Sequence, residues 1–93
     1  MIKATLNVTI AINKPFNLLY FKKEVILPIS PNMHDTIFVG NKEFKVAYRL
    51  FDVDEVDHIG INLEKEEVDE IRDSMLEYYN EYWDHNGTLN PIE

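Results

Sequence analysis

The sequence contains no cysteine and only three glycines. Without cysteine the chain has no disulfide, no thiolate nucleophile and no cysteine-based zinc site, so apolar packing must stabilise the fold. The glycines are scattered, which excludes a glycine-rich phosphate-binding loop. Ser30 lies between two prolines and Ser74 lies within a predicted helix, so neither serine is in the strand-turn-helix elbow of a nucleophile. We therefore expect a protein that is not an enzyme and that needs no cofactor.

A long hydrophobic run is also missing. The N-terminal residues 1–13 are apolar at every second position, unlike a signal peptide or a membrane-spanning helix. We expect a cytoplasmic protein with no membrane partner. The net charge of -8 argues against direct binding of nucleic acid, because phosphate contacts need clustered lysine and arginine.

The charge is unevenly distributed along the chain. Residues 1–51 hold seven lysines or arginines and three acidic residues, whereas residues 64–85 hold two bases and nine acids. Residues 52–63 hold four acids and no lysine or arginine. The two halves of the chain therefore favour different partners.

The first 63 residues carry the period-two pattern of β-strands. Residues 2–12 alternate between apolar and polar side chains, and after Pro15 a second alternating run extends to Leu27, which predicts a long hairpin. Two prolines make residues 27–35 a connection. A second hairpin is predicted over residues 36–51 around a Gly-Asn-Lys turn, and a fifth strand over 58–63.

After Leu63 the period changes to that of an α-helix, predicted over residues 64–86 with a tail at 87–93. Six side chains form its predicted core-facing stripe: Val68, Ile71, Met75, Tyr78, Tyr79 and Tyr82. The predicted fold is a single α+β domain over residues 1–93. It is a β-meander over 1–63 whose antiparallel sheet of about five strands is curled or partly closed, with one C-terminal amphipathic helix packed on it.

On the predicted helix, six acidic residues align opposite the apolar stripe: Glu66, Glu70, Asp73, Glu77, Glu81 and Asp84. This predicted ridge would span about 27 Å at 1.5 Å per residue. Its five like-charge steps would cost on the order of 1 to 2.5 kcal/mol in all. Such a local conflict is typical of a functional surface. We therefore expect a binding module that places this ridge against a basic protein surface, with mimicry of nucleic acid as its narrower form.

Three alternatives remain open. In the first alternative, the six acidic residues bind no partner and form a solvated face that aids solubility. In the second alternative, the protein is an assembly protein that forms a homo-oligomer through a sheet edge or through Trp83. Trp83 falls at the margin of the apolar stripe, so we expect it to be free for a partner. The third alternative is a metal-assisted enzyme at Asp52, Asp54, Asp57 and His58.

The acidic segment from Asp52 resembles a calcium loop only at its first and third positions. Its sixth position is Asp57, where the turn needs glycine, and its twelfth is Leu63 rather than glutamate. The three histidines are far apart, and none has a second His or Cys at the spacing of metal ligands. We therefore expect no metal site.

Overall fold

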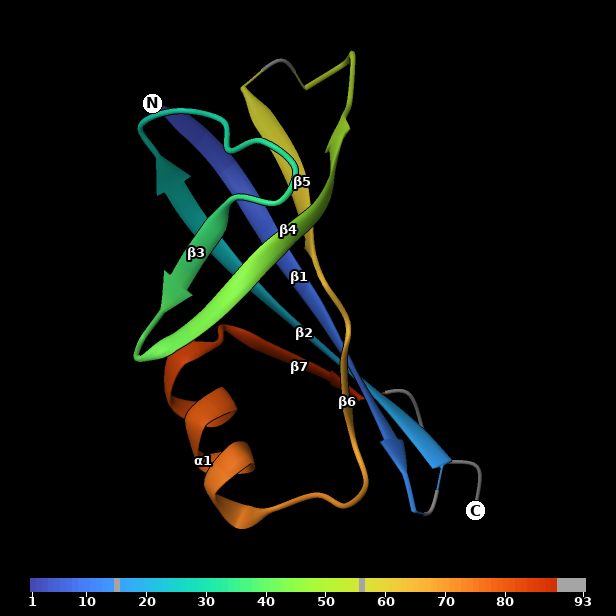
Figure 1. Cartoon of the computed structure of the whole chain (residues 1–93). Helices are drawn as coiled ribbons and strands as arrows, with labels where there is room; N and C mark the ends of the chain where they lie inside the picture. The colour runs from blue at the N-terminus through green and yellow to red at the C-terminus, as the bar shows by residue number, and fades with distance from the viewer. Residues whose placement is uncertain (15, 56, 89–93) are drawn as a thin grey trace.

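The structure, a computed structural model, describes residues 1–14, 16–55 and 57–88, and residues 85–88 by their backbone alone. The elements in chain order are β1 (Ile2–Asn13), β2 (Phe16–Leu27), β3 (Thr36–Val39), β4 (Lys42–Phe51), β5 (His58–Leu63), β6 (Glu66–Val68), α1 (Asp73–Tyr82) and β7 (His85–Thr88). Figure 1 shows a strongly twisted sheet in which β4 crosses in front of β1 and β2, with α1 near the end of the sheet where β6 and β7 lie. The predicted α+β class is confirmed.

The long strand β1 organises the sheet. On one edge it pairs antiparallel with β2 over its whole length, from Ile2 opposite Leu27 to Asn13 opposite Phe16. On its other edge it pairs parallel with β5 and then with β6. The strand order is β3-β4-β5-β1-β2-β7, with β6 attached to β1.

The sheet differs from the prediction in two respects. Most strand pairs are antiparallel, as predicted, but β1 pairs in parallel with β5 and β6, so the sheet is mixed and not a simple meander. The sheet is also not closed, whereas partial closure was one form of the prediction. The parallel pairs arise because the connection after β2 leads to the far edge, so that the β3-β4-β5 unit returns to β1 on the side opposite β2. Alternation in a sequence marks a strand but does not identify its neighbour.

The prediction of one helix over residues 64–86 is wrong at both ends. At the start, Glu66–Val68 form β6, which pairs with Ile10–Ile12 of β1. Because β5 covers only Lys3–Asn7 of β1, the buried far half of β1 would otherwise keep unpaired backbone groups. The extended segment satisfies those groups, and a helical start would leave them unpaired.

Helix α1 therefore has 10 residues, from Asp73 to Tyr82. The chain is extended again at Trp83, and the Asp84 N–H donates to the Lys22 carbonyl at 3.1 Å, next to the pairing of β7 with β2. Residues 87–88 of the predicted tail belong to β7, and residues 89–93 lie outside the described residues. Pairing with the free edge of β2 replaces the last helical turn that we predicted.

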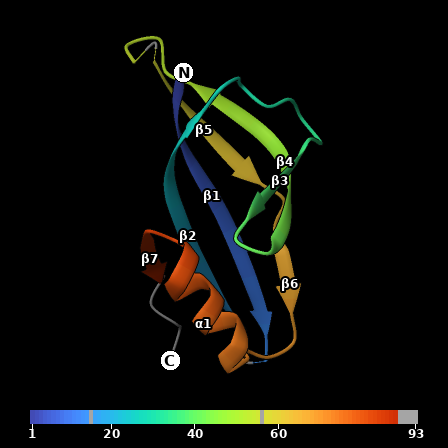
Figure 2. The same ribbon diagram turned by 90° about the vertical axis from the view of Figure 1, so that its left-hand side faces the viewer.

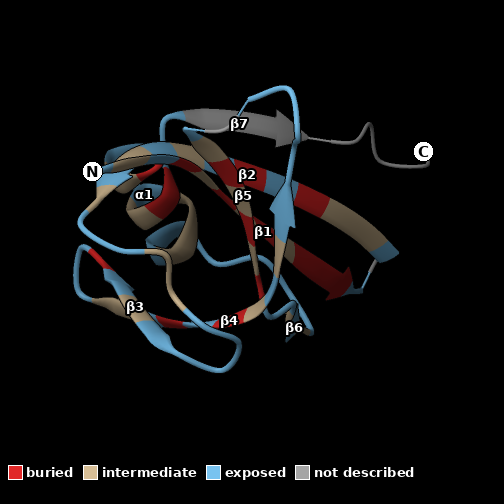
Figure 3. Cartoon of the chain, turned by 90° about the horizontal axis from the view of Figure 1, so that it is seen from above, coloured by how far each residue is buried: buried red, intermediate tan, exposed pale blue. Residues whose placement is uncertain are grey.

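The core lies between the inner face of the sheet and α1 (Figure 3). The inward side chains of β1 and β5 are almost fully buried, including Leu6, Ile10 and Ile61. Phe21 of β2 and Val46 of β4 are buried with them. The Tyr79 ring stacks on Phe21, with ring centroids 4.2 Å apart. Figure 2 shows α1 at the same end of the sheet as β6 and β7, away from the β4–β5 loop.

The predicted helical stripe is confirmed in part. On α1, Tyr79 is buried, and Met75, Tyr78 and Tyr82 are half-buried against the core. Val68 is also half-buried, but it lies on β6 and not on a helix. Ile71 is exposed, because residues 69–72 are a connection rather than part of the helix.

The β3–β4 turn fits closely against α1. Gly40 has a φ of 62°, and a Cβ atom at this position would lie 2.8 Å from the Tyr82 ring. Both the backbone conformation and the contact with Tyr82 therefore require glycine.

Two isoleucines provide a matched test of this core. We predict that Ile61→Ala lowers the free energy of unfolding by about 2 to 5 kcal/mol, because it leaves a cavity at a fully buried position. Ile26→Ala changes a side chain that is 63% exposed and is expected to cost less than about 0.5 kcal/mol. Denaturant unfolding measures both, and equal effects would contradict the assignment of the inner face.

Candidate functional site

The outward side of α1 carries three exposed carboxylates at successive four-residue steps: Asp73, Glu77 and Glu81. We call these three residues the α1 acidic face. They lie opposite the buried Tyr79 on the helix and span about 12 Å at 1.5 Å per residue. In the part of the chain that the structure describes, none of the three is in an ion pair. Their two like-charge steps each cost about 0.2 to 0.5 kcal/mol.

Two members of the predicted ridge instead hold the fold together. Glu66 belongs to β6, where its carboxylate lies 2.9 Å from the Lys42 Nζ and accepts a hydrogen bond from the Tyr79 hydroxyl at 3.5 Å. Asp84 follows α1, accepts the backbone N–H of Glu24 at 2.7 Å and lies 3.8 Å from the Lys23 Nζ. The prediction that Glu66 and Asp84 belong to an exposed helical ridge is therefore wrong.

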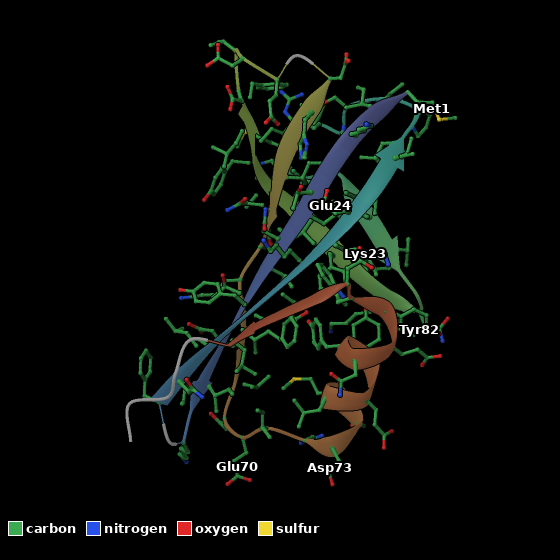
Figure 4. All side chains as sticks on the ribbon, turned by 180° about the vertical axis from the view of Figure 1, so that it is seen from behind. Met1, Lys23, Glu24, Glu70, Asp73 and Tyr82 are labelled. Atoms are coloured by element: carbon green, nitrogen blue, oxygen red, sulfur yellow. The ribbon has the colours of Figure 1, made fainter. Side chains whose placement is uncertain are left out.

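Glu70 lies in the connection before α1 and is also outside the helix. It lines a hollow of about 440 Å³ with Lys14, Val68, Asp69, Arg72 and Met75. Figure 4 shows Glu70 and Asp73 pointing outward at the same end of the molecule. The acidic surface is therefore shorter than the predicted 27 Å, since only the α1 acidic face keeps helical spacing.

Trp83 lies in the core, so the prediction that it is free for a partner is wrong. It is 6% exposed, and its ring packs edge-on against Phe44 with centroids 5.5 Å apart. Its indole N–H donates to the Tyr78 hydroxyl at 3.3 Å. Because the helix ends at Tyr82, the helical wheel that placed Trp83 at the margin of the stripe does not apply to it.

The two central tyrosines are structural. The Tyr78 hydroxyl donates to the Val39 carbonyl at 2.6 Å. Burial raises the pKa of the Tyr79 phenol well above its usual range, and the nearby Glu66 carboxylate raises it further. Burial also raises the pKa of Tyr78, against the opposing effect of the hydrogen bond from Trp83. Both phenols therefore stay protonated at neutral pH and hold α1 to the sheet.

The described residues of the loop from Asp52 to His58 form bonds within the loop and with β1. The Asp52 carboxylate accepts the backbone N–H of Asp54 at 2.9 Å. The His58 Nε2 lies 2.8 Å from the Thr5 hydroxyl, and its Nδ1 lies 3.7 Å from the Glu55 carboxylate. Within the residues described, no group of three or more His, Cys, Asp or Glu side chains is placed to hold a metal ion. The geometry gives a metal-assisted reaction at this loop no support.

Sequence reasoning missed a polar network on the outer face of the sheet. The Thr5 hydroxyl donates to Glu24 at 3.0 Å and contacts His58, so the network joins β2, β1 and β5. The Asn7 side-chain amide donates to the Thr5 carbonyl and to the Asn62 side-chain oxygen, both at 3.4 Å. The Asn62 amide in turn donates to the Tyr48 hydroxyl at 2.7 Å. The alternation placed Thr5 on a wet face, but the pairing of the strands was needed to find its neighbours.

Comparison of the chain with protein-family models, with curated proteins and with solved structures finds no match. Among the described residues, no helix has the length and hydropathy needed to cross a membrane.

The single tryptophan provides a direct test of this site. We predict that Trp83 fluorescence is blue-shifted in the folded protein and weakly quenched by acrylamide, because the indole is shielded from water. Unfolding in denaturant should shift the emission to longer wavelength and increase quenching. If the folded protein emitted and was quenched like the unfolded chain, Trp83 would be exposed and free for a partner after all.

Proposed function

We propose that the protein is a non-enzymatic binding module whose α1 acidic face contacts a basic surface of a partner protein. The main support for this proposal is that only some of the carboxylates at this end of the molecule are bonded within the fold. Glu66 and Asp84 form bonds within the fold, whereas Asp73, Glu77 and Glu81 are exposed and in no ion pair of the described residues. The helix dipole favours Asp73 in the first turn of α1, but Glu77 and Glu81 lie beyond that turn and repel their neighbours on the helix.

In its narrower form, the proposal is that the α1 acidic face occupies a groove that normally holds a nucleic-acid backbone. Adjacent carboxylates are about 6 Å apart along the helix axis. A DNA strand carries one phosphate per about 3.4 Å of axis. The α1 acidic face therefore has about half the charge density of one DNA strand. Because it is short, it would fill only a short basic groove of the partner.

The test compares two triple variants that change the net charge equally. We predict that Asp73→Asn, Glu77→Gln and Glu81→Gln together leave the fold intact, because exposed like charges are removed. The same variant should lose most of its capture of basic proteins from a cell lysate, and the capture by the unmodified protein should be released by salt. Competing duplex DNA should also release the partner if the protein mimics nucleic acid.

The matched control is Glu43→Gln, Glu64→Gln and Glu67→Gln, three exposed acids outside α1. It should retain capture. Equal losses in both variants would mean that net charge alone governs binding, and full capture by the α1 variant would exclude the α1 acidic face as the binding surface.

Assembly through a sheet edge is the second candidate function. One observation favours it: the outer strand β3 has only four residues and carries Phe38, which is 68% exposed. The Trp83 end is not available for this role because Trp83 is buried. A mass that rises with concentration in sedimentation, and that Phe38→Ser returns to the monomer, would favour assembly over the α1 acidic face.

A further inference from the structure

A hollow of about 420 Å³ lies at the β4–β5 end of the molecule, which is the end opposite α1 in Figures 1 and 2. We call it the Gly60 pocket. Its lining residues are Leu50, Phe51, Asp52, Val53, Glu55, His58 and Gly60. Its size is in the range of pockets that hold a small ligand or a side chain.

Gly60 keeps this hollow open. His58, Gly60 and Asn62 alternate with the buried Ile59 and Ile61, so they face the outer side of the sheet. Gly60 is paired with Leu50 of β4. A Cβ atom at Gly60 would lie 3.4 Å from the Leu50 Cβ, so a larger side chain here would fill the space beside Leu50.

His58 forms a fixed wall of the pocket. Its Nε2 lies 2.8 Å from the Thr5 hydroxyl, which in turn donates to Glu24. Its Nδ1 lies 3.7 Å from the Glu55 carboxylate. Contacts on both ring nitrogens hold the imidazole at this side of the pocket.

The lining of the pocket combines exposed apolar side chains with the carboxylates of Asp52 and Glu55. Lys3 of β1 pairs with His58 but is not a lining residue. Leu50, which pairs with Gly60, is 53% exposed, and Val53 is 87% exposed. Phe51 pairs with the buried Ile59, so its ring turns to the inner face beside Arg49. Four acids lie in this segment of the sequence, Asp52, Asp54, Glu55 and Asp57, and the sequence has no lysine or arginine between Arg49 and Lys65.

Arg49 does not neutralise these acids. Its guanidinium lies 5.4 Å from the centroid of the Phe51 ring and donates to the Ser30 hydroxyl at 3.3 Å. It pairs with the buried Ile61, which places it on the inner face of the sheet, opposite the face to which Gly60 points.

We propose that the Gly60 pocket binds an arginine side chain of a partner polypeptide, flanked by apolar residues. The aliphatic stem of the arginine packs against Leu50, and its guanidinium binds the carboxylates of Asp52 and Glu55. Arginine fits this role because its planar guanidinium donates several hydrogen bonds to carboxylates, whereas its stem covers apolar surface. A neighbouring apolar residue of the partner covers Val53.

This inference does not depend on the α1 acidic face. The molecule is 40 Å long, and the two surfaces lie at its opposite ends. The two proposals can therefore fail separately.

The test is a titration of the isotopically labelled full chain with a short peptide, acetyl-Leu-Arg-Leu-amide, followed by nuclear magnetic resonance. The control peptide replaces arginine with citrulline, which has nearly the same shape and no charge. We expect saturable shifts of the Leu50, His58 and Gly60 amides with the arginine peptide. Binding of the citrulline peptide should be weaker by about tenfold or more, because the charge-assisted hydrogen bonds are lost. Equal binding of both peptides, or shifts elsewhere on the molecule, would overturn the proposal.

Two double variants locate the binding on the protein. Asp52→Asn with Glu55→Gln should weaken the arginine peptide by about tenfold, whereas Asp73→Asn with Glu77→Gln should leave its affinity unchanged. Asparagine keeps the side-chain oxygen that accepts the Asp54 N–H, so the loop turn is retained. Unchanged binding in the first variant, or equal weakening in both, would show that the Gly60 pocket is not the site.

Discussion

The structure depends on one constraint: both edges of β1 must be hydrogen-bonded along a strand whose inward side chains are buried. β2 satisfies one edge completely, but β5 ends after pairing with Asn7. The remaining edge, at Ile10–Ile12, is completed by β6. An unpaired buried backbone group costs about 1 to 3 kcal/mol, which outweighs the few tenths per residue that favour a helix at a surface segment. The short length of α1 and its position at this end of the sheet follow from that pairing.

The aromatic side chains then close the inner face. Tyr79 stacks on Phe21, Trp83 packs against Phe44, and Tyr78 bonds both Trp83 and the Val39 carbonyl. These contacts leave the outer face of the sheet uncovered by any described element. They also fix α1 so that its carboxylates point to solvent. The proposed binding surfaces are thus at opposite ends: the α1 acidic face beside β6 and β7, and the Gly60 pocket beside the β4–β5 loop.

Much of the sheet could be predicted from the sequence, because strict alternation identifies a strand with one buried face. The range 58–63 predicted for the fifth strand is that of β5, and both hairpins were predicted where the structure has them. Residues 64–72 could not be assigned in the same way. Val68 and Ile71 fit a helical stripe as well as a strand followed by a connection, and only the unpaired edge of β1 decides between the two. The roles of Glu66 and Asp84 could not be predicted for a similar reason. Both fit an acidic ridge on a helical wheel, but they form ion pairs with Lys42 and Lys23, which are distant in sequence.

The central claim is that residues 66–68 form a strand on β1 and are not the first turns of a helix. Amide hydrogen exchange together with interstrand nuclear Overhauser effects tests it most directly. We predict slow exchange for the amides that are hydrogen-bonded between Ile10–Ile12 and Glu66–Val68. We also predict nuclear Overhauser contacts between protons of these two strands. Helical Cα chemical shifts and sequential amide contacts continuing from Glu64 through Arg72 would contradict it, and would restore the long acidic helix that the sequence alone suggests.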